Sequence, residues 1–392
     1  MSDGENSTAE TAEDADTRDE YLAQWEIAVL AAIFLLTMFG NCLVLAALYI
    51  RRYRGRRRKL TRMYFFMMHL SIADLLNALL NVLPQFAWDL TFRFQGGPVL
   101  CKLVKFVQPL PTYLSSYVLT ATAIDRYQAI CHPINYCRTT SRRSRMMVYG
   151  SWCVALVLCT PQIFVFSYQE IFPGVWDCWA YFDMPYGERA YVTWFSVTVF
   201  LLPFAVLVYT YTRICHGIWK NGEISIFAKR DGTRNERNRE PLISRAKINT
   251  VKQTITVVSL YAITSSPFIS CQLWATWDPN AASSPFSTGP AFAILALLSS
   301  LTSCVNPWIY LCFNSELRII LSDVFMRAVG LEAEHDLSWN TSHDPSTRSS
   351  QIGKSTRSSG SSRQQSFHRK DRIGNFTNSI SNRENGFHNQ PK

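Results

Sequence analysis

Seven long apolar segments divide this chain, and they constrain its fold more than any other feature. Each is about 20 residues or longer, the length that an α-helix needs to cross the hydrocarbon core of a bilayer. Lipid offers no hydrogen-bond partners, so each segment must satisfy its backbone groups internally as a helix. We therefore predict an all-α membrane protein with a seven-transmembrane helix bundle over residues 26–313. The segments span roughly residues 26–50, 63–88, 103–130, 146–168, 189–215, 249–277 and 289–313.

The charges between these segments predict how the chain crosses the membrane. The stretches "RRYRGRRRKLTR" and "RTTSRRSR" and the loop over residues 217–252 are rich in basic residues, whereas residues 1–25 are acidic around "AEDADTRDE". Basic loops stay on the cytoplasmic side of a membrane. We expect a multi-pass plasma-membrane protein with its N-terminus outside the cell and its C-terminus in the cytoplasm.

The two ends of the chain have different compositions from the bundle. Residues 314–329, "NSELRIILSDVFMRAV", place apolar residues at helical spacing beside charged ones, which is typical of a short amphipathic helix on the cytoplasmic membrane surface, against lipid. Residues 330–392 are rich in Ser, Thr, Arg and Gly, so we expect a disordered cytoplasmic tail open to phosphorylation. Asn6, in the extracellular residues 1–25, opens an Asn-Ser-Thr sequon and is a predicted glycosylation site.

Two of the eleven cysteines differ from the rest in their position. Most lie inside apolar segments, where a reduced cysteine packs as a small apolar residue. Cys101 lies at the outer start of the third segment and Cys178 in the loop after the fourth, both on the oxidising side of the membrane. We predict a disulfide between them.

A carboxylate in the middle of the second segment is energetically expensive. At the centre of a bilayer, Asp74 in "HLSIADLLNALL" costs about 3 kcal/mol, so it should face the bundle interior and find polar partners or an ion. The alternative is a protonated Asp74 in a hydrogen-bonded core. The candidates to share its buried polar network are Asn41, Thr302, Ser303 and Asn306.

Charges and prolines in the segments indicate a bundle that switches between two packings. Asp125 and Arg126 lie near the cytoplasmic end of the third segment, deep enough to need pairing, and they are predicted to act as a latch. The alternative is that Arg126 only anchors the helix end. Prolines that remove backbone hydrogen bonds interrupt four segments and create weak points for movement: Pro84, Pro203, Pro267 and Pro307.

The chain resembles the rhodopsin-like (class A) G-protein-coupled receptors. The residues that carry the resemblance are Gly40-Asn41, "LSIAD" ending at Asp74, Cys101, "DRY" at 125–127, Trp152, Pro203 with Tyr211, Pro267, and "NPWIY" at 306–310. The resemblance implies coupling to a heterotrimeric G protein, with arrestin and receptor kinases acting through the tail. It assigns the coupling and switch roles to Asp125, Arg126, Tyr127, Tyr211, Pro267, Asn306, Pro307 and Tyr310, and the buried network to Asn41, Asp74 and Ser303.

Within that family the chain is most similar to the vasopressin/oxytocin-type peptide receptors. The similar stretches include "NVLPQFAWDLTFRF", "CKLVKFVQ", "DRYQAICHP", "SRAKINTVK" and "PFISCQLWATWD". The resemblance implies a small, disulfide-cyclised neurohypophysial-type peptide hormone as ligand, and signalling through a G protein of the Gq class and calcium. A receptor for a different neuropeptide is the alternative.

Glutamines in the outer halves of four segments independently favour a ligand rich in amide groups. Gln85, Gln108, Gln162 and Gln272 each offer a donor and an acceptor, and Lys105 lies one turn above Gln108. Leaving such a buried group unpaired costs about 1 to 3 kcal/mol, so converging glutamines select for amides. The alternative is that they only bridge helices. The resemblance adds Arg18 and Glu26 as charged ligand-contacting residues.

Departures from the family pattern set further expectations. Thr264 and Ser265 stand in "AITSSPF", where the family usually has Cys-Trp, and Thr302 stands where Asn is frequent. Apart from a sodium ion at Asp74, which Thr302 disfavours, we expect no metal, cofactor or nucleic acid. A transporter and a membrane enzyme are rival classes, but the chain has no internal repeat and no HExxH or GxSxG motif, so no enzyme is expected.

Overall fold

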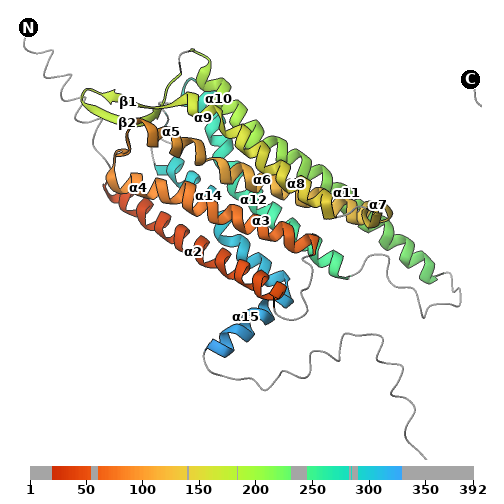
Figure 1. Cartoon of the computed structure of the whole chain (residues 1–392). Coiled ribbons are helices and arrows are strands. Elements are labelled where there is room, and N and C mark those ends of the chain that lie inside the picture. The colour runs from red at the N-terminus through yellow and green to blue at the C-terminus, as the bar shows by residue number, and fades with distance from the viewer. Residues whose placement is uncertain are drawn as a thin grey trace, which may run out of the picture. The chain divides into compact units, whose positions relative to one another are not determined.

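The computed structural model of the protein describes residues 20–53, 61–138, 141–182, 184–230, 245–281, 284 and 290–328. These residues are mostly helical (Figure 1). The first half of the chain forms α2 (Glu20–Tyr53), α3 (Arg62–Asn77), η1 (Ala78–Val82), α4 (Leu83–Thr91), α5 (Gly97–Val107), α6 (Leu110–Cys131) and α7 (Pro133–Arg138). The second half forms α8 (Ser141–Cys159), α9 (Pro161–Val165), α10 (Gly187–Ser196), η2 (Val197–Leu201), α11 (Leu202–Arg230), α12 (Arg245–Trp277), α14 (Pro290–Phe313) and α15 (Ser315–Ala328).

These helices confirm the predicted seven-helix bundle. Six spans are long and apolar enough to cross a membrane: α2, α3 to α4, α8 to α9, α10 to α11, α12 and α14. The remaining span, α5 and α6, is more polar, because Ser116, Thr122 and Asp125 are among its buried residues. The bundle extends beyond the predicted limits, since α2 begins at Glu20 rather than at residue 26 and α5 at Gly97 rather than at residue 103.

A two-stranded hairpin follows the fourth span, where the sequence predicted helix up to residue 168. Strand β1 (Phe166–Phe172) pairs antiparallel with β2 (Val175–Ala180), with Tyr168 opposite Cys178. Gly174 forms the turn with a positive φ of 79°, which glycine adopts without steric cost. The helical prediction for residues 166–168 was wrong because aromatic residues suit a strand as well as an apolar helix.

Two of the four prolines follow a π-helical turn. Pro84 comes two residues after η1, and Pro203 two residues after η2. In η2 the N–H of Leu202 bonds to the carbonyl of Val197, five residues earlier, so the turn is wider than an α-helical one. Local widening is one way in which a helix accommodates a residue without an N–H. Pro267 and Pro307 lie inside α12 and α14.

Side chains from neighbouring helices bond to carbonyls that proline leaves without a donor. Pro203 has no N–H for the carbonyl of Val199, and the Tyr261 hydroxyl donates to that oxygen at 2.9 Å. Pro307 likewise has none for the carbonyl of Ser303, which accepts from Asn41 Nδ2 at 3.1 Å. These bonds join α12 to η2 and α2 to α14.

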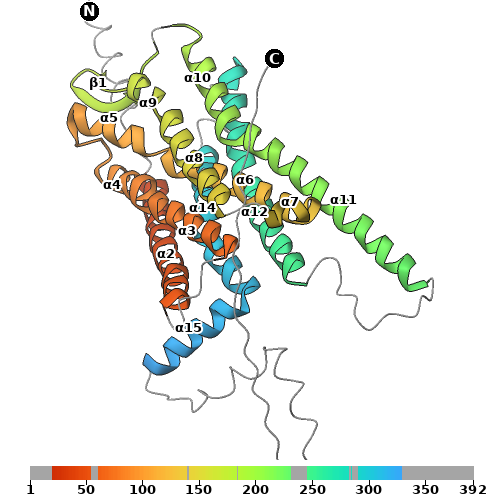
Figure 2. The same ribbon diagram turned by 45° about the vertical axis from the view of Figure 1, so that its right-hand side comes forward.

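Helix α6 lies at the centre of the bundle. It packs against α3, α8 and α11, and its residues Tyr113, Leu114 and Val118 are fully buried. The hairpin and α15 lie at opposite ends of the bundle (Figures 1 and 2). We call these the hairpin end and the α15 end.

Candidate functional site

A cavity of about 520 Å³ opens into the bundle at the hairpin end. It is lined by every described residue for which the sequence predicted ligand contact: Glu26, Gln85, Lys105, Gln108, Gln162 and Gln272. These residues come from α2, α4, α5, the α5–α6 junction, α9 and α12. Arg18, the seventh, lies outside the described residues, as does Asn6.

The glutamines of this cavity are only partly satisfied by one another. Gln108 Nε2 lies 3.5 Å from Gln85 Oε1, and Gln85 Nε2 donates to Asp89 Oδ1 at 2.9 Å. Gln162 Nε2 donates to the Tyr191 hydroxyl. Within the described part of the chain the side-chain oxygen of Gln272 accepts no hydrogen bond. An amide group of a ligand could therefore donate to the side-chain oxygen of Gln272. It could also accept from the side-chain amide groups of the other glutamines, in place of their present partners.

Lys105 places a positive charge beside two aromatic rings, of which Phe166 lines the cavity. Its Nζ lies 4.2 Å from the ring centroid of Trp88 and 5.1 Å from that of Phe166, within cation–π range. The carboxylate of Asp177 also attracts it. The ammonium group of Lys105 and the apolar faces of these rings therefore lie together near Gln108.

The predicted disulfide fixes the hairpin over this end of the bundle. Cys101 of α5 and Cys178 of β2 are joined, with their Cα atoms 5.6 Å apart, and both are fully buried. The neighbouring Asp177, 3% exposed, accepts from the backbone N–H of Phe94 at 3.2 Å and pairs with Arg93 at 3.5 Å. The hairpin is therefore held both covalently and by a charge-assisted contact to the α4–α5 connection.

The cavity continues past the glutamines to Asp74, which is 1% exposed. Asn306 Nδ2 donates to Asp74 Oδ2 at 3.0 Å, and the Ser303 hydroxyl also bonds to the carboxylate. Asn77 Nδ2 in turn donates to Ser303 Oγ at 3.2 Å. Asn41 joins through the backbone of Ser303 instead. Three of the predicted partners of Asp74 are therefore in or beside its network.

The fourth predicted partner bonds elsewhere. Thr302 Oγ1 lies 2.6 Å from Thr264 Oγ1, so these two departures from the family pattern contact each other across α12 and α14. The sequence also did not identify Asp89 and Tyr191 as cavity residues. The spacing of Asp89 four residues after Gln85 was a usable signal, because such residues are neighbours on one helix face. Tyr191 had no such local signal.

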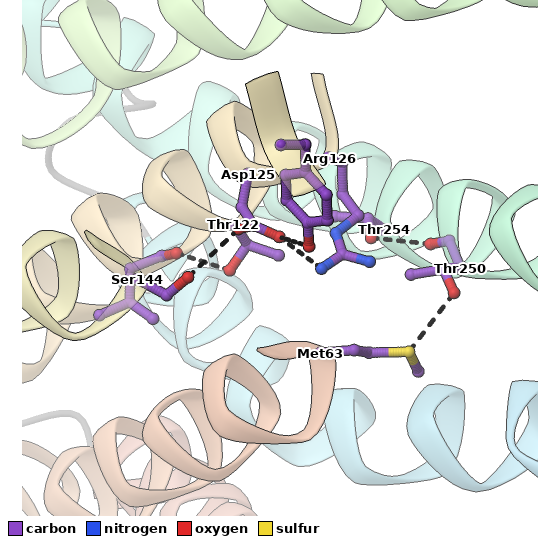
Figure 3. Close-up of polar contacts among 9 residues, drawn as sticks. Met63, Thr122, Asp125, Arg126, Ser144, Thr250 and Thr254 are labelled. Atoms are coloured by element: carbon purple, nitrogen blue, oxygen red, sulfur yellow. Dashed lines mark hydrogen bonds and ion pairs between the residues drawn. The ribbon is translucent and has the colours of Figure 1, made fainter. Parts of the chain in front are cut away.

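At the α15 end, Asp125 and Arg126 form the ion pair predicted for the third span (Figure 3). Arg126 Nη2 lies 2.5 Å from Asp125 Oδ2, and the carboxylate also accepts from Tyr136 at 3.2 Å and Ser144 at 3.3 Å. Burial, and then the charge of Asp125, raises the pKa of Tyr136, so its hydroxyl stays protonated and able to donate. Tyr127, the third residue of the motif, does not join this ion pair; its hydroxyl lies 3.2 Å from His132 Nε2.

Helix α12 closes over Arg126 through contacts to α3 and to the junction between α14 and α15. Thr250 Oγ1 donates to Met63 Sδ of α3 at 3.4 Å (Figure 3), and Asn314, between α14 and α15, donates to Gln253 Oε1 at 3.1 Å. The space left beside Arg126 is about 30 Å³ and is bordered by Tyr310. That volume holds a water molecule and no protein segment. Tyr211, on α11, is buried.

Helix α15 is attached to the bundle through Glu316. Its Oε1 lies 3.0 Å from Arg51 Nε of α2, and its Oε2 accepts from the Tyr64 hydroxyl at 2.9 Å. The Arg51 guanidinium also lies 4.2 Å from the Tyr64 ring centroid. Side chains from α2 and α3 therefore fix the first turn of α15. The part of the chain that the structure describes holds no group of three metal-ligating side chains.

Comparisons with known proteins show the family of this chain. The model of the "7 transmembrane receptor (rhodopsin family)" matches residues 26–310. The vasopressin V1b receptor of Mus musculus is 42% identical over 320 residues, which cover 76% of this chain and 75% of that receptor. The annetocin receptor of Eisenia fetida is 39% identical over 352 residues, covering 77% and 82%. Cephalotocin receptor 1 of Octopus vulgaris is 40% identical over 324 residues, covering 76% and 79%.

Proposed function

Because this chain belongs to the vasopressin/oxytocin type of the rhodopsin family of seven-transmembrane receptors, we propose that it binds a cyclic peptide of that type. In this proposal the bound receptor activates a heterotrimeric G protein of the Gq class, which raises the calcium concentration in the cell. It is a multi-pass plasma-membrane receptor and not an enzyme. In the proposed orientation the hairpin end faces the outside of the cell and the α15 end the cytoplasm. The basic loops support this orientation.

The single observation that best supports the peptide is the convergence of four glutamines and Lys105 on one cavity. The amide groups of a peptide backbone, and a carboxamide end, match their donors and acceptors. Aromatic residues that line the cavity, among them Phe166, Tyr191 and Phe195, provide apolar surface for the rest of the ring of a cyclic peptide. Glu26 also lines the cavity and extends the proposed contact, and Arg18 is a further proposed ligand contact.

The closed α15 end supports a switch between two packings. With α12 held over Arg126, no segment of a G protein fits beside this residue. A peptide that binds the open packing more tightly shifts the population toward it. Arg126 then leaves Asp125 and becomes available to the partner. Arrestin and receptor kinases act on the same face in this proposal, through residues 330–392.

The experiment is a calcium assay in cells that express the receptor. A panel of oxytocin- and vasopressin-like peptides is applied, with linear reduced versions as controls and surface expression measured in parallel. A saturable calcium rise with cyclic peptides alone supports both the ligand class and Gq coupling. Silence at normal surface expression contradicts the proposal, and a response without calcium in a cyclic-AMP assay contradicts Gq alone.

A receptor for a different neuropeptide is the second candidate, favoured by Ser265 and Thr264. Ser265 lines the cavity and stands where the family usually has a larger residue, which changes the depth that a ligand can reach. Its neighbour Thr264 bonds to Thr302, which also lines the cavity. The same assay with other neuropeptide classes tests it.

A further inference from the structure

Thr61 presents a hydroxyl group at the surface of the α15 end. It is exposed and lies immediately before α3, where Tyr64 bonds to Glu316 of α15. It occupies the N-cap position of α3 with an extended backbone (φ −67°, ψ 156°), but its side chain makes no capping bond. A threonine at this position usually accepts from an N–H of the first helical turn. The hydroxyl of Thr61 therefore remains accessible to an enzyme.

The sequence before Thr61 is a run of positive charge. Residues 56–59 read Arg-Arg-Arg-Lys, and Leu60 separates them from Thr61. From residue 27 to residue 73 the sequence contains no Asp or Glu, so no acid interrupts this charge. Protein kinases select substrates partly by charge, and a kinase with an acidic substrate groove favours basic residues before the acceptor hydroxyl. The stretch "RRRKLT" has this pattern.

Two simpler explanations do not account for Thr61. The preference of basic loops for the cytoplasm explains the arginines but not a threonine beside them. A structural role as N-cap would require the capping bond that Thr61 lacks. Ser144 provides the contrast, since it also follows two arginines, Arg142 and Arg143, but is only 2% exposed and donates to Asp125 at 3.3 Å. Thr61 combines the basic context with exposure, and Ser144 does not.

We propose that Thr61 is a phosphorylation site for a serine/threonine kinase that prefers basic substrates. In this reaction Thr61 Oγ1 attacks the γ-phosphorus of ATP, and the bond between that phosphorus and the oxygen bridging to the β-phosphate breaks. ADP leaves, and the hydroxyl proton passes to the catalytic base of the kinase. The inference rests on the proposed orientation, because ATP and these kinases are found in the cytoplasm.

A phosphate on Thr61 gains partners that the unmodified side chain does not use. The first turn of α3 offers backbone N–H groups and the positive end of the helix dipole. Arg62 follows Thr61 directly, and Arg51 and Arg52 lie in the last turn of α2, so the phosphate enters a positive field. Phosphorylation should therefore stabilise the start of α3.

The test is phosphorylation of the purified full-length receptor in detergent, with ATP and the catalytic subunit of cAMP-dependent protein kinase. Phosphopeptide mass spectrometry should find phosphate on Thr61 and none on Ser144. Casein kinase 2, which prefers acidic substrates, should leave Thr61 unmodified. Thr61→Val keeps the shape of the side chain without its hydroxyl, so it should lose this phosphate and keep any on residues 330–392.

The unfolding temperature measures the structural consequence. Treatment with the kinase should raise the Tm of the wild type by about 1 to 4 °C. It should leave the Tm of Thr61→Val unchanged, which controls for phosphates elsewhere. Without kinase the two proteins should unfold at the same temperature, because the hydroxyl of Thr61 makes no capping bond. Circular dichroism shows whether Thr61→Val is folded, and Thr61→Ala takes its place if it is not.

Three results would overturn the proposal. They are no phosphate on Thr61 with the cAMP-dependent kinase, equal modification of Thr61 by casein kinase 2, and equal modification of Ser144. A Tm of the wild type that the modification leaves unchanged would reject the stabilisation of α3. The experiment contains neither peptide nor G protein, so its outcome is the same whether or not the proposed peptide function holds.

Discussion

The hydroxyl of Tyr261 donates to the backbone carbonyl of Val199 at 2.9 Å, at the point where Pro203 leaves that carbonyl without its α-helical donor. The same hydroxyl lies 2.9 Å from Ser116 Oγ on α6. One phenol thus connects α12, η2 and α6 in the middle of the bundle. Any movement of α12 relative to α6 has to break or rearrange these contacts.

We expect Tyr261→Phe to lower stability by about 1 to 3 kcal/mol, because it leaves buried polar groups without a partner. The measurement is the unfolding temperature of the purified receptor. Tyr209→Phe, which removes a hydroxyl from a residue 59% exposed on α11, is the control and should have little effect. Equal effects of the two variants would show that the Val199 contact contributes nothing.

Gly40→Ala should destabilise the bundle through a steric clash. A Cβ at Gly40 would lie 2.9 Å from Pro307 Cγ, so α2 and α14 would have to separate. Overpacking of this kind costs about 1 to 3 kcal/mol, which exceeds the gain of about 1 kcal/mol in helix propensity. Gly150→Ala meets no atom within 4 Å and is the matched control. A thermal unfolding experiment in which both variants behave alike would contradict close packing at Gly40.

Gln108→Leu should weaken peptide binding by about tenfold without reducing surface expression, because a buried amide contact is worth about 1 to 3 kcal/mol. Radioligand binding on intact cells measures both quantities. Gln128→Leu, on α6 and outside the cavity lining, should bind normally. Unchanged affinity in Gln108→Leu would remove this residue from the site.

Arg126→Ala should abolish G-protein activation and leave peptide affinity intact, because Arg126 lies at the α15 end and not in the cavity lining. Nucleotide exchange on a purified G protein, measured beside peptide binding, separates the two functions. A parallel loss of both would indicate a folding defect and contradict a specific role for Arg126.

Gln253→Ala should have the opposite effect and raise signalling without ligand. It removes the bond from Asn314 that holds α12 closed, and a loss of about 1 kcal/mol shifts a two-state population by about fivefold. Basal calcium or inositol phosphate at matched expression is the readout. Thr256→Ala, an exposed α12 residue that bonds only to its own helix, is the control. Basal activity that stays at the level of the control would show that this bond does not hold the closed state.

The sequence was informative wherever one physical constraint acts alone. Hydropathy defined the seven spans, and the oxidising side of the membrane identified the Cys101–Cys178 pair. The limits of β1 could not be predicted, because "FSYQEIF" suits a strand and an apolar helix equally well. Ser265 was recognised as a departure, but the volume that it opens depends on how α3, α6, α12 and α14 pack together.

The central position of α6 has a consequence for how the protein is made. Its buried polar residues, Ser116, Thr122 and Asp125 among them, are sheltered by α3, α8 and α11 in the finished bundle. A ribosome delivers α6 before α8 and α11 exist. The third span therefore reaches the translocon as a poorly hydrophobic helix whose shelter has not yet been synthesised, and its stable insertion depends on spans that emerge after it.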